Sequence, residues 1–198
     1  MSTIVNAETI WYLVRASGTV AYLFLAASTI WGLILSSRLL REIVPGPLTL
    51  AMHNYLSWNA LGLTALHAVL LLFTSYMDYT VRDLLVPFSG PYSPFWVGIG
   101  IIGMYLLLLT TLTFYVRGRI GYRAFHAVHY LTYPAFGMAL LHSWFAGTDT
   151  PALEMVYLVT GVTVLFLTLY RVLAAVGGGG AVMRGPGGEN GRIPSAVK

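Results

Sequence analysis

The 198-residue chain is 57% hydrophobic and only 9% charged, a composition that excludes an ordinary soluble domain and indicates a polytopic membrane protein. Its net charge of +4 comes from few residues that cluster between apolar segments, which argues against nucleic-acid binding. The absence of cysteine excludes disulfides, cysteine-ligated iron–sulfur clusters, covalent c-type haem attachment and a catalytic thiol, so histidine is left as the main metal ligand.

Apolar stretches long enough to cross a bilayer occur five times in the chain. A crossing needs roughly 20 apolar residues, and the stretches that meet this requirement are residues 10–35, 48–76, 95–116, 122–145 and 153–176. The first contains Arg15 and follows Glu8, without a positive leading region, so we expect it to remain as a span and not to be a signal peptide. The predicted fold class is all-α, a polytopic membrane bundle of five transmembrane helices.

The connections between the spans differ in charge. Arg38 and Arg41 follow the first span, before Pro45 and Pro47, which end one helix and delay the next. Residues 117–123 form a basic turn between the third and fourth spans, whereas the other two connections carry aspartate and glutamate. By the positive-inside rule the N-terminus lies outside and the C-terminus is cytoplasmic, as in a multi-pass protein of a bacterial plasma or inner membrane.

Two segments outside the spans have simple predictions. The external loop, residues 79–94, contains a stretch at 83–88 that fits either a short interfacial helix or an irregular connection. After a single transmembrane domain of residues 1–176, the Gly-, Pro- and polar-rich residues 177–198 predict a disordered cytoplasmic tail. The glycine run in this tail lacks the preceding strand and the lysine of a phosphate loop, so it does not indicate a nucleotide site.

Four histidines lie inside the apolar stretches, where an ionisable side chain is costly without a partner. Because spans two and four run in the same direction, we expect His53 to face His129 at one depth and His67 to face His142 at another. The separations of 14 and 13 residues correspond to about 21 and 19.5 Å along the two helices, so the two levels nearly match. Thirteen residues fall about 140° short of whole turns. Either Pro134 kinks the helix or changes its register locally, or His129 and His142 approach their partners from different sides.

Two facing imidazoles can hold a haem iron from both sides, and a six-coordinate haem b suits electron transfer because neither axial position is open. We therefore predict two haem b groups, an inner one on His53 and His129 and an outer one on His67 and His142. His126 is an alternative inner ligand. Its separation of 16 residues from His142 matches the 14-residue separation of His53 and His67 less well, so the two histidines of the inner pair would lie at different depths.

Further residues near the histidines have two interpretations each. Some are small enough to let a flat macrocycle approach or simply to allow close helix packing: Ala60, Gly62, Ala65, Gly137 and Ala139. Others are arginines that fit a contact with a haem propionate or a role in setting topology: Arg15, Arg38, Arg117, Arg119 and Arg123.

The sequence resembles the ferric reductase-like transmembrane domain shared by NADPH oxidases, ferric reductases and the haem subunit of the bacterial periplasmic methionine sulfoxide reductase. The resemblance spans roughly residues 10–175 and rests on three patterns: His53-x13-His67, Phe125-x3-His129-x12-His142 with Tyr130 and Tyr133, and a leading span that begins Arg15-Ala-Ser-Gly18 and ends Gly32-Leu-Ile-Leu-Ser-Ser-Arg38. It implies that the four histidines are axial ligands of two haems b, which carry electrons from a cytoplasmic reductant to an external acceptor.

Unlike the oxidases and ferric reductases, this chain has only a short glycine-rich segment after the fifth span, so we expect it to lack the cytoplasmic flavin and nicotinamide domains. We therefore expect a separate flavoprotein, a quinol or another redox subunit to deliver electrons. Five spans in place of the six common in the family suggest that a partner helix or self-association completes the bundle within the lipid, as an oligomer or part of a larger complex.

Two alternatives remain open from the sequence. A quinol-oxidising cytochrome b subunit of a respiratory or photosynthetic complex would use the same haems and add a quinone pocket. A histidine-lined metal or proton transporter would need no haem but would require a carboxylate-bearing path, and spans two to five contain no Asp or Glu except Glu154 at one end.

Overall fold

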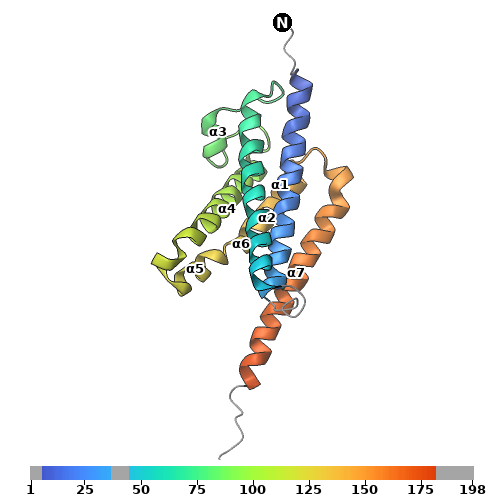
Figure 1. Ribbon diagram of the computed structural model, residues 1–198. Helices are drawn as coiled ribbons and strands as arrows, with labels where there is room; N and C mark the ends of the chain where they lie inside the picture. The colour runs from blue at the N-terminus through green and yellow to red at the C-terminus, as the bar shows by residue number, and fades with distance from the viewer. Residues whose placement is uncertain (1–5, 37–44, 182–198) are drawn as a thin grey trace, which may run out of the picture.

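The computed structural model describes residues 6–36 and 45–181, and within these ranges all regular secondary structure is helical (Figure 1). The helices are α1 (Ala7–Ser36), α2 (Gly46–Leu70), the 3-10 helix η1 (Leu71–Phe73), α3 (Val81–Leu85), α4 (Pro94–Ile120), α5 (Tyr122–His129), α6 (Thr132–Ala146) and α7 (Thr150–Ala181). Arg38 of the predicted site lies outside the described residues.

Four of the described helices are long and apolar enough to cross a membrane. They are α1, α2 with its extension to Phe73, α4, and α7 as far as Ala174. Figure 1 shows α1, α4 and α7 running in one direction and α2 and α6 returning in the other. The prediction of an all-α, multi-pass membrane protein is therefore confirmed, whereas the orientation of the termini stays a prediction.

A continuous fifth span over residues 122–145 is not confirmed, because this segment is divided into α5 and the 15-residue α6. Pro134 has no N–H to donate to the carbonyl of Tyr130, four residues earlier. The amide of Tyr133 takes that carbonyl instead, at 3.2 Å, and the Leu131 amide bonds to Val128 three residues back. The helix therefore breaks at residues 130–131, close to where a kink was expected.

The connection between α2 and α4 folds back onto the bundle. Within the predicted 83–88 stretch only the start is helical, since α3 ends at Leu85. Thr80 and Asp83 cap its N-terminus reciprocally, and these hydrogen bonds hold the pKa of Asp83 below its usual value. The hydroxyl of Tyr105 on α4 donates to the Leu85 carbonyl, which ties the connection to α4.

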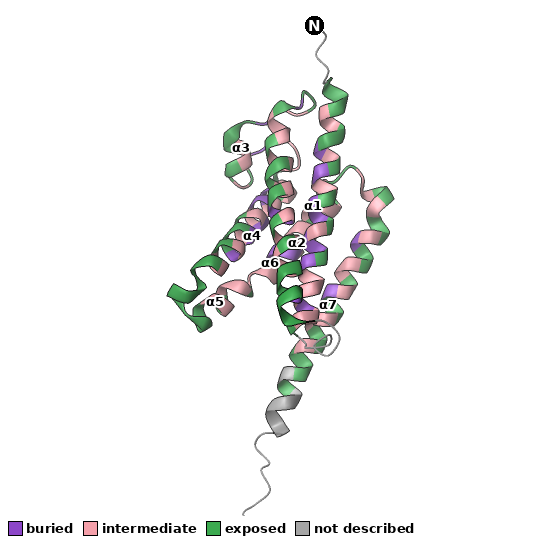
Figure 2. Cartoon of the chain, in the orientation of Figure 1, coloured by how far each residue is buried: buried purple, intermediate pink, exposed green. Residues whose placement is uncertain are grey.

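The bundle is held together around Tyr22 on α1. Its ring lies 6.2 Å from that of Phe136 on α6 and 5.0 Å from that of Tyr157 on α7, and its hydroxyl is 2.5 Å from Thr160 Oγ1. Ala60 on α2 is fully buried in the same core. Figure 2 shows that buried residues line the inside of the bundle, whereas the outer sides of α2 and α7 are exposed.

The last helix extends further than the sequence indicated. The predicted fifth span ended at Val176, whereas α7 continues to Ala181. The domain boundary after residue 176 stays a prediction. The rest of the predicted tail, residues 182–198, lies outside the described residues, so its predicted disorder stays a prediction.

Candidate functional site: two facing histidine pairs

The inner pair joins His53 on α2 with His129, the last residue of α5. Their ring centres are 6.1 Å apart and the ring planes are inclined by 77°. Both side chains line a cavity of about 320 Å³ between α1, α2, α4, α5 and α6. This volume lies at the lower end of the roughly 300–1,000 Å³ of common small-molecule sites.

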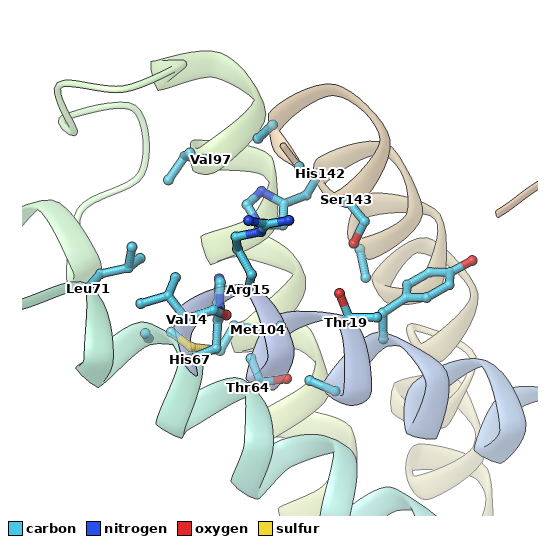
Figure 3. A pocket seen from close by; sticks show the side chains of 18 of the residues that line it. Val14, Arg15, Thr19, Thr64, His67, Leu71, Val97, Met104, His142 and Ser143 are labelled. Carbon is cyan, nitrogen blue, oxygen red and sulfur yellow. The ribbon is translucent and has the colours of Figure 1, made fainter. Parts of the chain in front are cut away.

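The outer pair joins His67 on α2 with His142 on α6. Here the ring centres are 6.4 Å apart and the planes are inclined by 72°. The two rings line a second cavity, of about 190 Å³, and Figure 3 shows them pointing into it together with Arg15 of α1. The two pairs thus have nearly the same geometry at two levels of the bundle.

The break between α5 and α6 allows both pairs to form. In one straight helix His129 and His142 would point in directions about 140° from each other, so both could not face α2. Because the chain changes direction at residues 130–131, each histidine meets its partner on α2. The structure brings together the four residues that the sequence singled out.

Three of the four rings are fixed by a backbone carbonyl of a neighbouring helix. His67 donates its Nδ1–H to the Val14 carbonyl at 2.9 Å, and His142 donates to the Trp96 carbonyl at 3.0 Å. His53 donates in the same way to the Ser28 carbonyl at 3.1 Å. A carbonyl only accepts, so Nδ1 carries the proton and Nε2 keeps the lone pair of a neutral imidazole. This is the arrangement that prepares a histidine to bind a metal through Nε2.

His129 differs from the other three. Its Nδ1 is buried and has no hydrogen-bond partner among the described residues. Its ring is stacked on that of Phe125, with centres 5.4 Å apart and planes inclined by 23°. Packing against Phe125 orients this ring in place of a carbonyl.

His126, the alternative inner ligand, also lines the inner cavity but is engaged elsewhere. Its Nδ1 bonds to the Tyr122 carbonyl at 2.9 Å, and its ring lies 3.9 Å from the ring of Tyr122. The ring that faces His53 is that of His129. The geometry thus favours His129 over His126 as the partner of His53.

The arginines near the site are distributed differently from the prediction. Arg15 lines the outer cavity but is ion-paired with Asp149, its Nε lying 2.8 Å from Oδ2. Arg123 is exposed and does not line either described cavity. Arg171 of α7, which was not among the predicted propionate contacts, lines the inner cavity and donates to the Tyr133 hydroxyl at 3.0 Å. Its position inside an apolar span was the signal that could have identified it.

Glycines other than the predicted ones lie close to the histidines. Gly62 and Gly137 face open space. Of the five small residues that the sequence indicated near the histidines, only Ala139 lines one of the two cavities. Gly18, Gly32 and Gly100 instead contact the rings of His67, His53 and His142. These contacts depend on how the helices pack, and the sequence pattern did not show them.

The paired rings fit the axial ligands of a haem. A metal–imidazole bond is about 2 Å long, and the centre of the imidazole ring lies about 1 Å beyond the bonded nitrogen. Two imidazoles on opposite sides of one metal therefore have ring centres about 6 Å apart. The observed 6.1 and 6.4 Å agree with this distance. No group of three or more potential metal ligands occurs in the described part of the chain, so its residues offer pairs and no larger cluster.

Comparison with known protein families identifies a relationship for this chain. Residues 16–140, more than half of the chain, match the family described as ferric reductase like transmembrane component, and the matched region contains His53, His67 and His129. No curated protein and no solved structure matches the chain significantly. A family match over this length, together with the helical membrane fold, shows that the chain belongs to the ferric reductase-like transmembrane component family.

Proposed function

We propose that this protein is a membrane-embedded b-type cytochrome with two bis-histidine haem b sites, which carries electrons from a cytoplasmic reductant to an external acceptor. The observation that carries this proposal is the presence of two facing histidine pairs with ring centres 6.1 and 6.4 Å apart, each in its own cavity. Membership of the ferric reductase-like family supports the same function, a membrane electron-transfer component.

In this proposal His53 and His129 hold the inner haem, and His67 and His142 hold the outer haem. Held between two imidazoles, haem b would supply reversible one-electron chemistry. The protein orients His53, His67 and His142 through Nδ1 hydrogen bonds and His129 through its packing on Phe125. Mostly apolar side chains surround the four ligands and exclude water.

Arg171 is the candidate for a propionate contact at the inner site. It is the one charged side chain among the described residues lining the inner cavity, and no described acidic residue pairs with it. At the outer site Arg15 could take the same role only by exchanging or sharing its pairing with Asp149. Arg123, which is exposed, is not proposed for this role.

The direction of transfer rests on the distribution of charge. The end of the bundle nearer His53 carries Arg117, Arg119, Arg123 and Arg171 and no acidic residue in its described part. The opposite end carries Asp78, Asp83, Asp149 and Glu154. By the positive-inside rule the arginine-rich end faces the cytoplasm, which makes the His53–His129 site the inner one.

The proposed partners follow from the electron-transfer role and from the exposed apolar surface. A separate cytoplasmic flavoprotein or other redox subunit delivers single electrons, and exposed apolar faces such as that of α7 contact lipid or a further helix. Val162, Phe166 and Leu173 on α7 are 63%, 65% and 70% exposed, so a second copy or a larger complex has apolar surface available. We place the protein in a bacterial plasma or inner membrane.

Electron transfer across a sealed vesicle tests the proposal. The purified protein is reconstituted into liposomes that contain ferricyanide, and a flavin reductase with NADPH is added outside. We expect b-type absorption bands and reduction of the trapped ferricyanide by the wild type, but not by His67→Ala. Protein without b-type bands would contradict the proposal. Reduction by an added quinol and not by the flavin reductase would instead identify a quinol-oxidising cytochrome b.

A further inference from the structure

Three of the histidine rings lie directly against glycines. A Cβ added to Gly18 would come within 2.8 Å of His67 Nδ1, and one added to Gly100 would come within 2.7 Å of His142 Cγ. At Gly32 the added atom would lie 3.1 Å from His53 Cε1. The first two distances are too short for any side chain without movement of the ring, and the third is tight.

Each of these glycines lies four residues after the carbonyl that accepts the histidine Nδ1–H. Gly18 follows Val14, Gly32 follows Ser28, and Gly100 follows Trp96. A helical side chain tilts toward the N-terminus and covers the turn before its own residue. Any side chain four residues after the accepting carbonyl would therefore lie where the ring approaches. Glycine leaves the carbonyl open to a donor from another helix.

The fourth ligand of the proposed sites has no such arrangement. His129 Nδ1 is buried and without a partner in the described chain, and none of the described glycines contacts its ring. The outer site therefore has two ring–glycine contacts, by which we mean a histidine ring packed on a glycine with Nδ1 bonded to the carbonyl four residues earlier. The inner site has one.

Resting on the proposed haem function, we propose that Gly18, Gly32 and Gly100 are positioning residues, which fix the rings and tautomers of His67, His53 and His142. Gly18 and Gly100 act on the outer haem alone, and Gly32 acts on the inner haem alone. Hydrogen bonding at Nδ1 makes a ligating imidazole more basic. Losing a ring–glycine contact should therefore change both the retention and the midpoint potential of one haem.

The chain provides matched controls for alanine substitution. Gly62 on α2, Gly137 on α6 and Gly118 on α4 have no atom within 4 Å of an added Cβ. Replacing a helical glycine by alanine improves helix propensity at every one of these positions. A loss at Gly18, Gly32 or Gly100 therefore measures the contact with the ring and not the substitution itself.

A potentiometric titration of the difference spectrum tests the proposal, with the outer component identified as the one missing in His67→Ala. We expect Gly18→Ala and Gly100→Ala to shift the potential of the outer component and to speed its haem loss to excess apomyoglobin by about 10- to 100-fold. Gly32→Ala should affect only the inner component. Equal behaviour of these variants and the Gly62→Ala, Gly137→Ala and Gly118→Ala controls would overturn the proposal, as would a change of both components together.

A double-mutant cycle covers the case in which Gly18→Ala does not fold well. With the ring removed in His67→Ala, the added methyl group of Gly18→Ala has no ring to meet. We expect Gly18→Ala to lower the Tm of the wild type but not that of His67→Ala. An equal decrease in both backgrounds would show that Gly18 does not act through His67. A wild type that binds no haem would instead refute the proposed function.

Discussion

The guanidinium group of Arg171 on α7 donates a hydrogen bond of 3.0 Å to the hydroxyl of Tyr133 on α6, inside the cavity that holds His53 and His129. Its carbon Cζ also lies 5.7 Å from the centre of the Tyr130 ring. A fixed positive charge is therefore held beside the inner histidine pair by two aromatic residues. This arrangement links the last helix of the chain to the site built by the others.

Replacing Arg171 by glutamine should alter the inner haem. A nearby positive charge favours the reduced haem over the oxidised haem, so removing the charge should lower the midpoint potential of the inner component. A tenfold change in this one-electron equilibrium corresponds to about 60 mV. Potentiometric titration in isolated membranes measures this shift. Arg123→Gln is the matched control, because its side chain is exposed, and it should leave both potentials unchanged.

Replacing Pro134 by alanine should impair the inner site. Alanine restores the N–H that can bond to the Tyr130 carbonyl, so the break at residues 130–131 is no longer favoured and His129 turns away from His53. We expect haem at the inner site to be bound about tenfold more weakly while the outer component is retained.

The control for this prediction is Pro151→Ala. Pro151 lies in the first turn of α7, where a missing N–H costs nothing. Spectral quantification of both components distinguishes the two variants. Retention of a normal inner component in Pro134→Ala would show that the break does not position His129.

Replacing Asp149 by asparagine should lower the Tm of the protein. The change leaves the Arg15 charge at the edge of the outer cavity without its partner. Adding Arg15→Gln should recover part of the loss, because the unpaired charge is then removed. Thermal unfolding in detergent measures both variants, with the exposed Asp78→Asn as a control. Additive effects of Arg15→Gln and Asp149→Asn would contradict a coupled pair.

Much of the architecture could be predicted from the sequence because apolar length and the cost of buried histidines are local properties. Four of the predicted spans correspond to long apolar helices, and the pairing of His53 with His129 and of His67 with His142 follows from helix direction and spacing. Pro134 indicated irregularity in the fourth segment. The sequence could not show that the helix would break at Tyr130, four residues before Pro134. The position of the break depends on which amide bonds to the Tyr130 carbonyl, which Pro134 leaves without a donor.

The surroundings of the histidines were less predictable because they depend on tertiary packing. Gly18 and Gly100 lie on helices other than those of the rings that they contact, so no spacing within one helix marks them. Arg15 was expected to be free for a ligand, yet the connection between α6 and α7 brings Asp149 to it. Arg171 was not among the predicted site residues, although it lies inside an apolar span and lines the inner cavity.

The most direct test of the account is the loss of individual haem components in single histidine variants. Purified wild type should bind two haems b per chain. His53→Ala and His129→Ala should lose the same component of the potentiometric difference spectrum, and His67→Ala and His142→Ala should lose the other, while His126→Ala keeps both. Loss of the inner component in His126→Ala but not in His129→Ala, or retention of two haems in all four variants, would contradict the pairing proposed here.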